Sequence, residues 1–238
     1  MSHGILIFQE MGIGVGDGDF SVKLNEDGSM DSSLILSTSY SVIPIWLRNA
    51  NDALIQAKSF FDELANNWPS DVNDQKKLLI SELEYSLQVF VACGIALDAL
   101  YDQIKPHAKI PATQLQSWKD NKTGRAKQIA LVLRQAFNLK PDLADEFQKN
   151  ITEIIKCRDM AVHPSTELKQ ACRRPDVPVG VDWKFSMYRY ENSLNCFSTT
   201  MNMLTYLFEN KSKSPVVNDQ INNIFLALQE MGVVEINA

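Results

Sequence analysis

The segment 158–164 brings together residue types that act on phosphate groups. Arg158 carries a permanent planar cation, which suits a phosphate, and His163 belongs to the residue type that exchanges protons near neutral pH. Asp159, four residues before His163, is near enough along a helix to accept a hydrogen bond from the imidazole. The combination indicates phosphate chemistry in which Asp159 orients the histidine.

The same residues also fit a purely structural interpretation. Cations near the carboxyl end of a helix interact favourably with its macrodipole, and a residue followed by proline is an ordinary helix stop. The segment alone leaves both interpretations open.

The element that must position the segment is a helix over 141–162. Apolar residues recur along it at a spacing near 3.6, at Leu143, Phe147, Ile151, Ile154 and Ile155. Pro164 disfavours helical dihedrals at His163, so the helix should end at about Val162. On an unbroken helix Arg158 and His163 would lie on different faces, whereas a break at His163 frees the imidazole to fold back beside the arginine.

The rest of the chain after residue 45 is predicted to be helical, which makes the protein mainly α. The expected helices span 48–66, 72–104, 123–138, 141–162, 186–210 and 216–231. The second is apolar around most of its middle and should form the core, with Gly94 allowing another helix to come close. Asp98 lies in this apolar stretch and requires a partner, for which an arginine from the helix 141–162 is one option.

Two segments are expected to be non-helical. Residues 1–42 should form a small β-hairpin or meander with strands near 4–9, 20–24 and 33–39, separate from a helical domain over 45–238. Residues 163–185 contain three prolines and a glycine beyond the helix stop and should be an extended loop. The glycines at 12–18 precede strand-like sequence rather than a helix, so a dinucleotide-binding loop is not expected there.

Composition limits the classes of function. The net charge of −6 argues against broad coating of nucleic acid, although it leaves room for a local basic cleft. Cations that could bind substrate surround the segment 158–164, namely Lys156, Lys169, Arg173 and Arg174.

The four cysteines form no Cys-x-x-Cys pair and indicate reduced thiols, and neither a signal peptide nor a membrane helix is apparent. A cytoplasmic location is therefore expected.

Two other chemistries could use residues of the same region. Cys157, His163 and Cys172 do not match the ligand spacing of a structural zinc site, so no metal is expected. A nucleophilic pair of Cys157 and His163 is disfavoured because six helical residues would point them to different sides.

With this helical context, residues 154–164 resemble the Arg-x4–6-His motif that ends a helix in the HEPN superfamily of helical bundles. The long helix over 72–104 is similar to the family's core helix, and the resemblance covers roughly residues 72–165. The family commonly has asparagine after the arginine, where this chain has Asp159.

The resemblance implies a metal-independent endoribonuclease that needs no cofactor and acts as a homodimer joining two motifs in one cleft. His163 would transfer protons, Arg158 would stabilise the charge on the phosphate, and Asp159 would orient His163 or hold the helix end. The product would be a 2′,3′-cyclic phosphate. The resemblance also implies a toxin or antiphage effector that a partner protein, such as an antitoxin, holds in check. A second interpretation remains open, a non-catalytic HEPN-like module for dimerisation or partner binding, which the acidic net charge favours.

Overall fold

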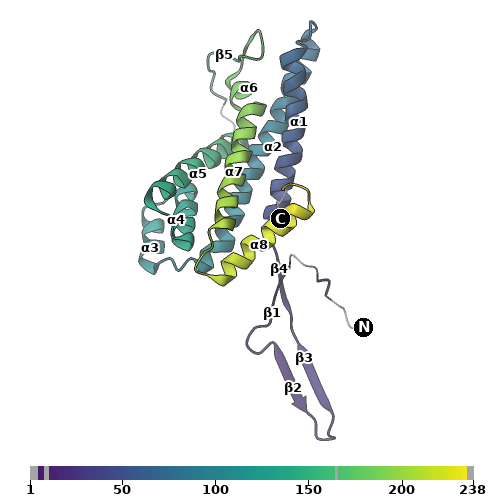
Figure 1. The fold of residues 1–238 in the computed structure, drawn as a ribbon, viewed down its shortest axis with the longest axis vertical. Coiled ribbons are helices and arrows are strands. Elements are labelled where there is room, and N and C mark those ends of the chain that lie inside the picture. The colour runs from purple at the N-terminus through teal and green to yellow at the C-terminus, as the bar shows by residue number, and fades with distance from the viewer. Residues whose placement is uncertain (1–4, 8–10, 164–165, 235–238) are drawn as a thin grey trace. The chain divides into compact units, whose positions relative to one another are not determined.

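The computed structural model describes residues 5–7, 11–163 and 166–234 and divides the chain into two compact units, residues 1–42 and 43–238. The prediction of a mainly helical protein with a small N-terminal β element is confirmed. Figure 1 shows the helices and strands of both units.

The first unit consists of two antiparallel two-stranded ribbons. One pairs β1 (Met11–Gly14) with β4 (Ser37–Tyr40), and the other pairs β2 (Phe20–Leu24) with β3 (Met30–Leu34). The expected strand over 20–24 is therefore present, whereas the one over 33–39 is divided between β3 and β4. The strand expected at 4–9 lies partly outside the described residues, and residues 5–7 are not in a strand.

The second unit is a bundle of helices around α2. Its elements are α1 (Ile43–Asn66), α2 (Val72–Ile104), the 3-10 turn η1 (Lys105–His107), α3 (Ala112–Asp120), α4 (Arg125–Phe137), α5 (Pro141–Val162), β5 (Cys172–Arg173), β6 (Gly180–Val181), α6 (Trp183–Met187), α7 (Tyr190–Glu209) and α8 (Pro215–Glu230). Helix α1 runs alongside α2, while α4, α5 and α7 also pack against α2 (Figure 1).

Helix α2 occupies the core because its middle is apolar on nearly every side. Val89, Cys93 and Leu97 are at most 1% exposed. The helix begins where the side chain of Asp71 accepts hydrogen bonds from the backbone N–H groups of Asn73 and Asp74, at 2.8 and 3.2 Å. Among the described residues, the segment Val72–His107 is long and apolar enough to cross a membrane by length and composition, but a core helix passes the same test.

Two regions differ from the sequence-based expectation. Residues 163–185 were predicted to be an extended loop, yet they contain the short β5–β6 hairpin and the start of α6. Val177 and Val181 in this region pack with Leu64 and Leu78 in a second apolar cluster, which fixes the path of the chain. Helix α3 begins directly after Pro111, in a stretch where no helix was expected, and it is held by Trp118, which is 5% exposed.

Candidate functional site

Helix α5 ends where the sequence predicts, at Val162. The backbone N–H of His163 still donates to the carbonyl oxygen of Asp159 at 2.9 Å, but His163 itself has left the helical region, with φ −121° and ψ 68°. The residue before a proline is driven out of helical dihedrals, which accounts for the stop. His163 is therefore the first residue beyond the helix, and it is exposed.

Arg158 is held by two carboxylates. Its Nη1 donates to Asp98 on α2, while Nε and Nη2 donate to Oδ1 of the adjacent Asp159 at 3.0 and 2.8 Å. The Arg158 side chain is only 16% exposed, and burial alone would lower the pKa of its guanidinium. The hydrogen bonds and charges of the two aspartates outweigh burial, so this pKa is raised and Arg158 remains cationic. The predicted arginine partner for Asp98 is thus present.

The close approach of α5 to α2 depends on Gly94. A Cβ atom at this position would lie 2.6 Å from Cδ of Arg158 and 3.0 Å from its Cβ and Cγ. The arginine side chain therefore lies directly on the backbone of α2, and Asp98, one turn further along that helix, receives its head group. The expectation that Gly94 allows a second helix to approach is confirmed.

Asp98 also faces a second arginine that sequence reasoning did not assign to it. Oδ1 of Asp98 lies 2.9 Å from Nε of Arg125 on α4, an ion-pair contact without hydrogen-bond geometry. The Arg125 guanidinium stacks 4.2 Å from the ring centre of Tyr101 and reaches Asp102 at 3.6 Å. The signal in the sequence is Arg125 itself, a basic residue near the start of the helix predicted over 123–138. Asp98 thus links α4 and α5 to the core helix.

The position of Asp159 differs from the predicted one. Its carboxylate was expected to accept a hydrogen bond from the His163 ring, but Oδ1 instead accepts two from Arg158. A neighbouring guanidinium presents two donors in a planar fork, which a single neutral ring nitrogen cannot match. Among the residues that the structure describes, the His163 side chain makes no ion pair or hydrogen bond.

The four cations assigned to substrate binding lie in different environments. Lys156, Lys169 and Arg173 are exposed. The ammonium of Lys169 lies 4.5 Å from the ring centre of Trp183 and 4.0 Å from Oε2 of Glu167. Arg174, by contrast, is 3% exposed and has no accessible side-chain surface.

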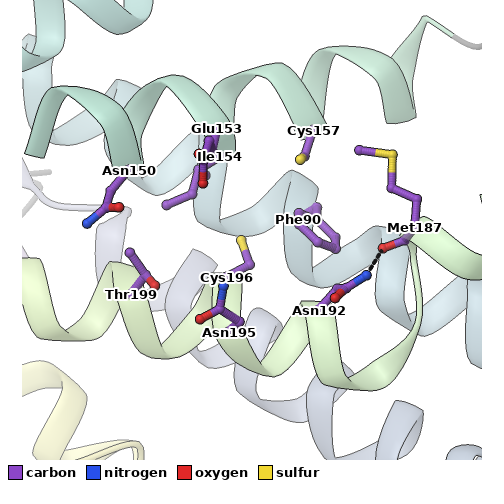
Figure 2. A pocket seen from close by; sticks show the side chains of 10 residues that line it. All are labelled: Phe90, Asn150, Glu153, Ile154, Cys157, Met187, Asn192, Asn195, Cys196 and Thr199. Atoms are coloured by element: carbon purple, nitrogen blue, oxygen red, sulfur yellow. Dashed lines mark hydrogen bonds between the residues drawn. The ribbon is translucent and has the colours of Figure 1, made fainter. Parts of the chain in front are cut away.

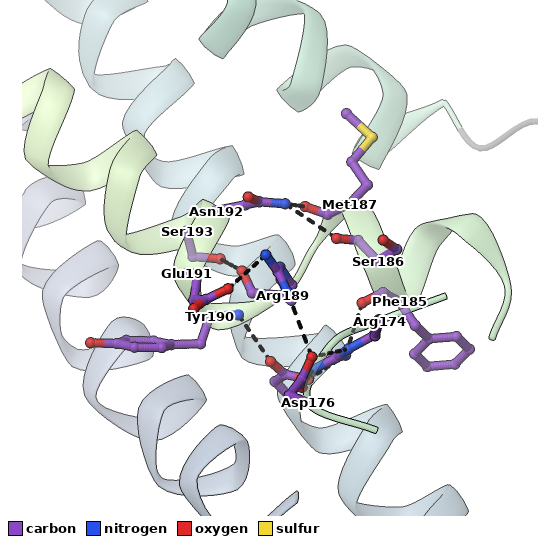
Figure 3. A network of polar contacts seen from close by, with 11 residues as sticks. Arg174, Asp176, Phe185, Ser186, Met187, Arg189, Tyr190, Glu191, Asn192 and Ser193 are labelled. Atoms are coloured by element: carbon purple, nitrogen blue, oxygen red, sulfur yellow. Dashed lines mark hydrogen bonds and ion pairs between the residues drawn. The ribbon is translucent and has the colours of Figure 1, made fainter. Parts of the chain in front are cut away.

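Arg174 is the centre of a buried ionic network, shown in Figure 3. Its Nη1 donates to Glu82 at 2.7 Å and to the carbonyl oxygen of Phe185 at 2.9 Å, while Nε and Nη2 donate to the carboxylate of Asp176. Glu82 also accepts from the backbone N–H of Tyr190 at 2.9 Å. In this arrangement Arg174 ties the loop before α6 to α2, and its guanidinium has no surface left for a substrate.

Burial has the largest effect on the two acids of this network. It raises the pKa of Glu82 above its usual value, because the opposing hydrogen bond and charge of Arg174 compensate only in part. Burial would also raise the pKa of Asp176, but there the hydrogen bonds and charge of Arg174 prevail and the pKa is lowered. The sequence carries a signal for Glu82, because a carboxylate beside the apolar middle of a core helix indicates a buried partner.

A pocket of about 220 Å³ lies between α5 and α7 (Figure 2). Asn150, Glu153 and Cys157 of α5 line one wall, and Phe90 of α2 lies at the back. The opposite wall is formed by four residues of α7, which are Asn192, Asn195, Cys196 and Thr199.

The two thiols in this pocket are not activated. Burial, followed by the charge of Glu153, raises the pKa of Cys157. A hydrogen bond with Cys93 and burial raise the pKa of Cys196 well above its usual value. Thiolates are the nucleophilic form, so neither cysteine has the environment of a nucleophile. Among the described residues, no group of three or more His, Cys, Asp or Glu side chains is placed to hold a metal ion.

Comparison of the chain with known protein families, with curated proteins and with solved structures found no match.

Proposed function

We propose that this protein is a metal-independent endoribonuclease in which Arg158 and His163 act on the scissile phosphate. The observation that carries the proposal is that one helix end presents an anchored cation and an exposed imidazole five residues apart. Asp98 and Gly94 fix the arginine from the side of the core, so its position does not depend on the substrate. A preorganised cation of this kind stabilises charge that develops in a transition state.

The chemistry assigned to the two residues is internal transesterification of RNA. The imidazole of His163 removes the proton of the 2′-hydroxyl, whose oxygen then attacks the adjacent phosphorus. Arg158 stabilises the added negative charge on the phosphate oxygens. The bond to the 5′-oxygen breaks, that oxygen takes up a proton from water, and the His163 imidazolium then releases its proton to solvent. The products are a 2′,3′-cyclic phosphate and a 5′-hydroxyl end.

A phosphate has to compete with Asp159 for the guanidinium. Asp159 is 53% exposed and Asp98 only 24%, so Asp159 is the carboxylate that the substrate displaces while Asp98 stays as the anchor. Lys156, Lys169 and Arg173 are exposed cations assigned to the flanking phosphates. Arg174 is left out of this role because Glu82 and Asp176 occupy its guanidinium.

The proposal includes a homodimer that joins two copies of the motif in one cleft, as the resemblance to the HEPN superfamily implies. A role as a toxin or antiphage effector under the control of a partner protein belongs to the same proposal.

The test is cleavage of labelled single-stranded RNA by the purified protein with a chelator present. Arg158→Ala and His163→Ala should each abolish cleavage, and the wild-type product should carry a 2′,3′-cyclic phosphate that acid treatment opens. Arg134→Ala and His107→Ala are matched controls of the same residue types outside the site, and both should cleave normally. Undiminished cleavage by both site variants would rule out the proposal, provided that their circular dichroism spectra match the wild type.

The second candidate function is a non-catalytic module for dimerisation or partner binding. It is favoured by the contacts of the Arg158 guanidinium, whose donors are occupied by Asp98 on α2 and by the adjacent Asp159 on α5. On this alternative the wild-type protein leaves RNA intact. Arg158→Ala would then lower the melting temperature because it leaves Asp98 with only the ion pair to Arg125.

A further inference from the structure

The ribbon formed by β2 and β3 has one apolar and one polar face. The register pairs Phe20 with Leu34, Val22 with Ser32 and Leu24 with Met30, so these side chains share one face. The other face carries the Ser21–Ser33 pair, whose hydroxyl oxygens lie 2.9 Å apart, and the Lys23–Asp31 pair. The two faces differ in chemistry along the whole ribbon.

The apolar face is exposed to an unusual degree. Phe20, Val22, Leu24, Met30 and Leu34 are 60, 53, 70, 72 and 54% exposed, respectively. An isolated two-stranded ribbon is at best marginally stable in water, and it needs a covered apolar face to persist. Contiguous exposed apolar surface of this kind marks an interaction site.

We infer that this face binds the same face of a second copy of the chain, so that two ribbons stack into a small β-sandwich. The inference rests on residues 20–34 alone and does not depend on RNA cleavage. The five side chains supply roughly 500 Å² per copy, counting about 150–200 Å² for each large apolar residue. The two copies together would thus bury about 1,000 Å², which is about the least that a specific interface is expected to bury.

Charge selects how the two ribbons are oriented. The turn between β2 and β3 carries Glu26 and Asp27, an acidic tip at one end of the ribbon. An antiparallel stack separates the two tips by about the length of five strand residues, roughly 16 Å. That distance exceeds the Debye length of about 8 Å at physiological salt, so the repulsion is largely screened. A parallel stack would bring the tips together. In the antiparallel stack Val22, at the middle of β2, lies opposite Val22 of the second copy.

The first test is the mass of the full chain in solution over a range of concentrations, by sedimentation equilibrium. The wild type should be a dimer. Val22→Lys, which places a charge at the centre of the apolar face, should raise the dimer dissociation constant at least 100-fold. Ser33→Lys is the matched control on the polar face and should leave the dissociation constant within about threefold of the wild type. A monomeric wild type, or equal dissociation constants for the two variants, would overturn the inference.

A second variant keeps the inference testable where Val22→Lys disrupts the ribbon itself. Residues 1–42 contain no cysteine, so a single Val22→Cys change adds a thiol that belongs to the ribbon alone. A bismaleimide with a spacer of about 10 Å, the usual distance between stacked sheets, should link two copies of this variant faster than it links Ser21→Cys or the wild type. If Ser21→Cys links as fast as Val22→Cys, the apolar face is not the interface.

Discussion

The carboxylate of Asp159 accepts two hydrogen bonds from the guanidinium of Arg158, at 2.8 and 3.0 Å. Asp159 therefore competes with a phosphate for Arg158, because these donors belong to the edge of the guanidinium that a phosphate would contact. On the other side Asp98 anchors the same arginine to the core helix. The balance between these carboxylates determines whether the motif is available to a substrate.

Replacing Asp159 should increase RNA cleavage if the nuclease proposal is correct. Asp159 is 53% exposed, so its pair with Arg158 should be worth about 0.2–1 kcal/mol. Asp159→Asn should therefore lower the KM for RNA by roughly 1.5- to 5-fold with little change in kcat. Asp142→Asn, on the exposed first turn of α5, makes the same charge change away from the site and is the control. A fall in kcat would instead support the predicted role of Asp159 in orienting His163.

Gly94→Ala should destabilise the bundle. Alanine gains about 0.5–1 kcal/mol of helix propensity over glycine, whereas overpacking costs roughly 1–3 kcal/mol. Overpacking should prevail because the new Cβ would lie 3.0 Å or less from three atoms of Arg158. Urea unfolding of Gly94→Ala should thus have a lower midpoint than that of the wild type. Gly124→Ala, where an added Cβ meets nothing within 4 Å, should shift the midpoint much less. A Gly94→Ala protein that is more stable than the wild type would contradict the packing described for α5.

Arg174→Ala should cost about 3–5 kcal/mol of unfolding free energy, the usual penalty for removing one partner of a buried ion pair. It leaves the carboxylates of Glu82 and Asp176, which are 0% and 8% exposed, without their main partner. The adjacent Arg173 is exposed, so Arg173→Ala should change the free energy by no more than about 0.5 kcal/mol. Equal losses in the two variants, measured by urea unfolding, would show that the network adds nothing to stability.

Stability should fall between pH 10 and 12 through Tyr188. Burial, followed by the nearby charge of Cys157, raises the pKa of Tyr188 from 10.0 to about 12. A pKa that is raised on folding stabilises the protein below the unfolded value, and that stability is lost as the pH rises through the folded value. The contribution should be on the order of 2 kcal/mol.

The matched variant for this effect is Tyr188→Phe. It also loses the hydrogen bond from the phenol to the carbonyl oxygen of Cys157, at 2.9 Å. It should be less stable than the wild type at pH 9, and the difference in unfolding free energy should shrink by pH 12. Parallel curves of stability against pH for the two proteins would show that Tyr188 titrates as it does in the unfolded chain.

The sequence was informative wherever a local rule governs the structure. The end of α5 at Val162 follows from the proline after His163, and the central place of α2 follows from an apolar surface on most of its sides. The need of Asp98 for a partner could be predicted for the same reason, since a carboxylate in an apolar helix has few alternatives.

Only the tertiary structure decided which charges meet. Arg173 and Arg174 are adjacent and identical in type, yet one is exposed and the other reaches Glu82, 92 residues away, because the β5–β6 hairpin packs on the ends of α1 and α2. Asp159 contacts Arg158 and not His163, and Asp98 is shared with Arg125 from a third helix. Spacing along one helix cannot predict such pairs. The energy of an ion pair depends on distance and solvent exposure, and both are set by the way the helices pack.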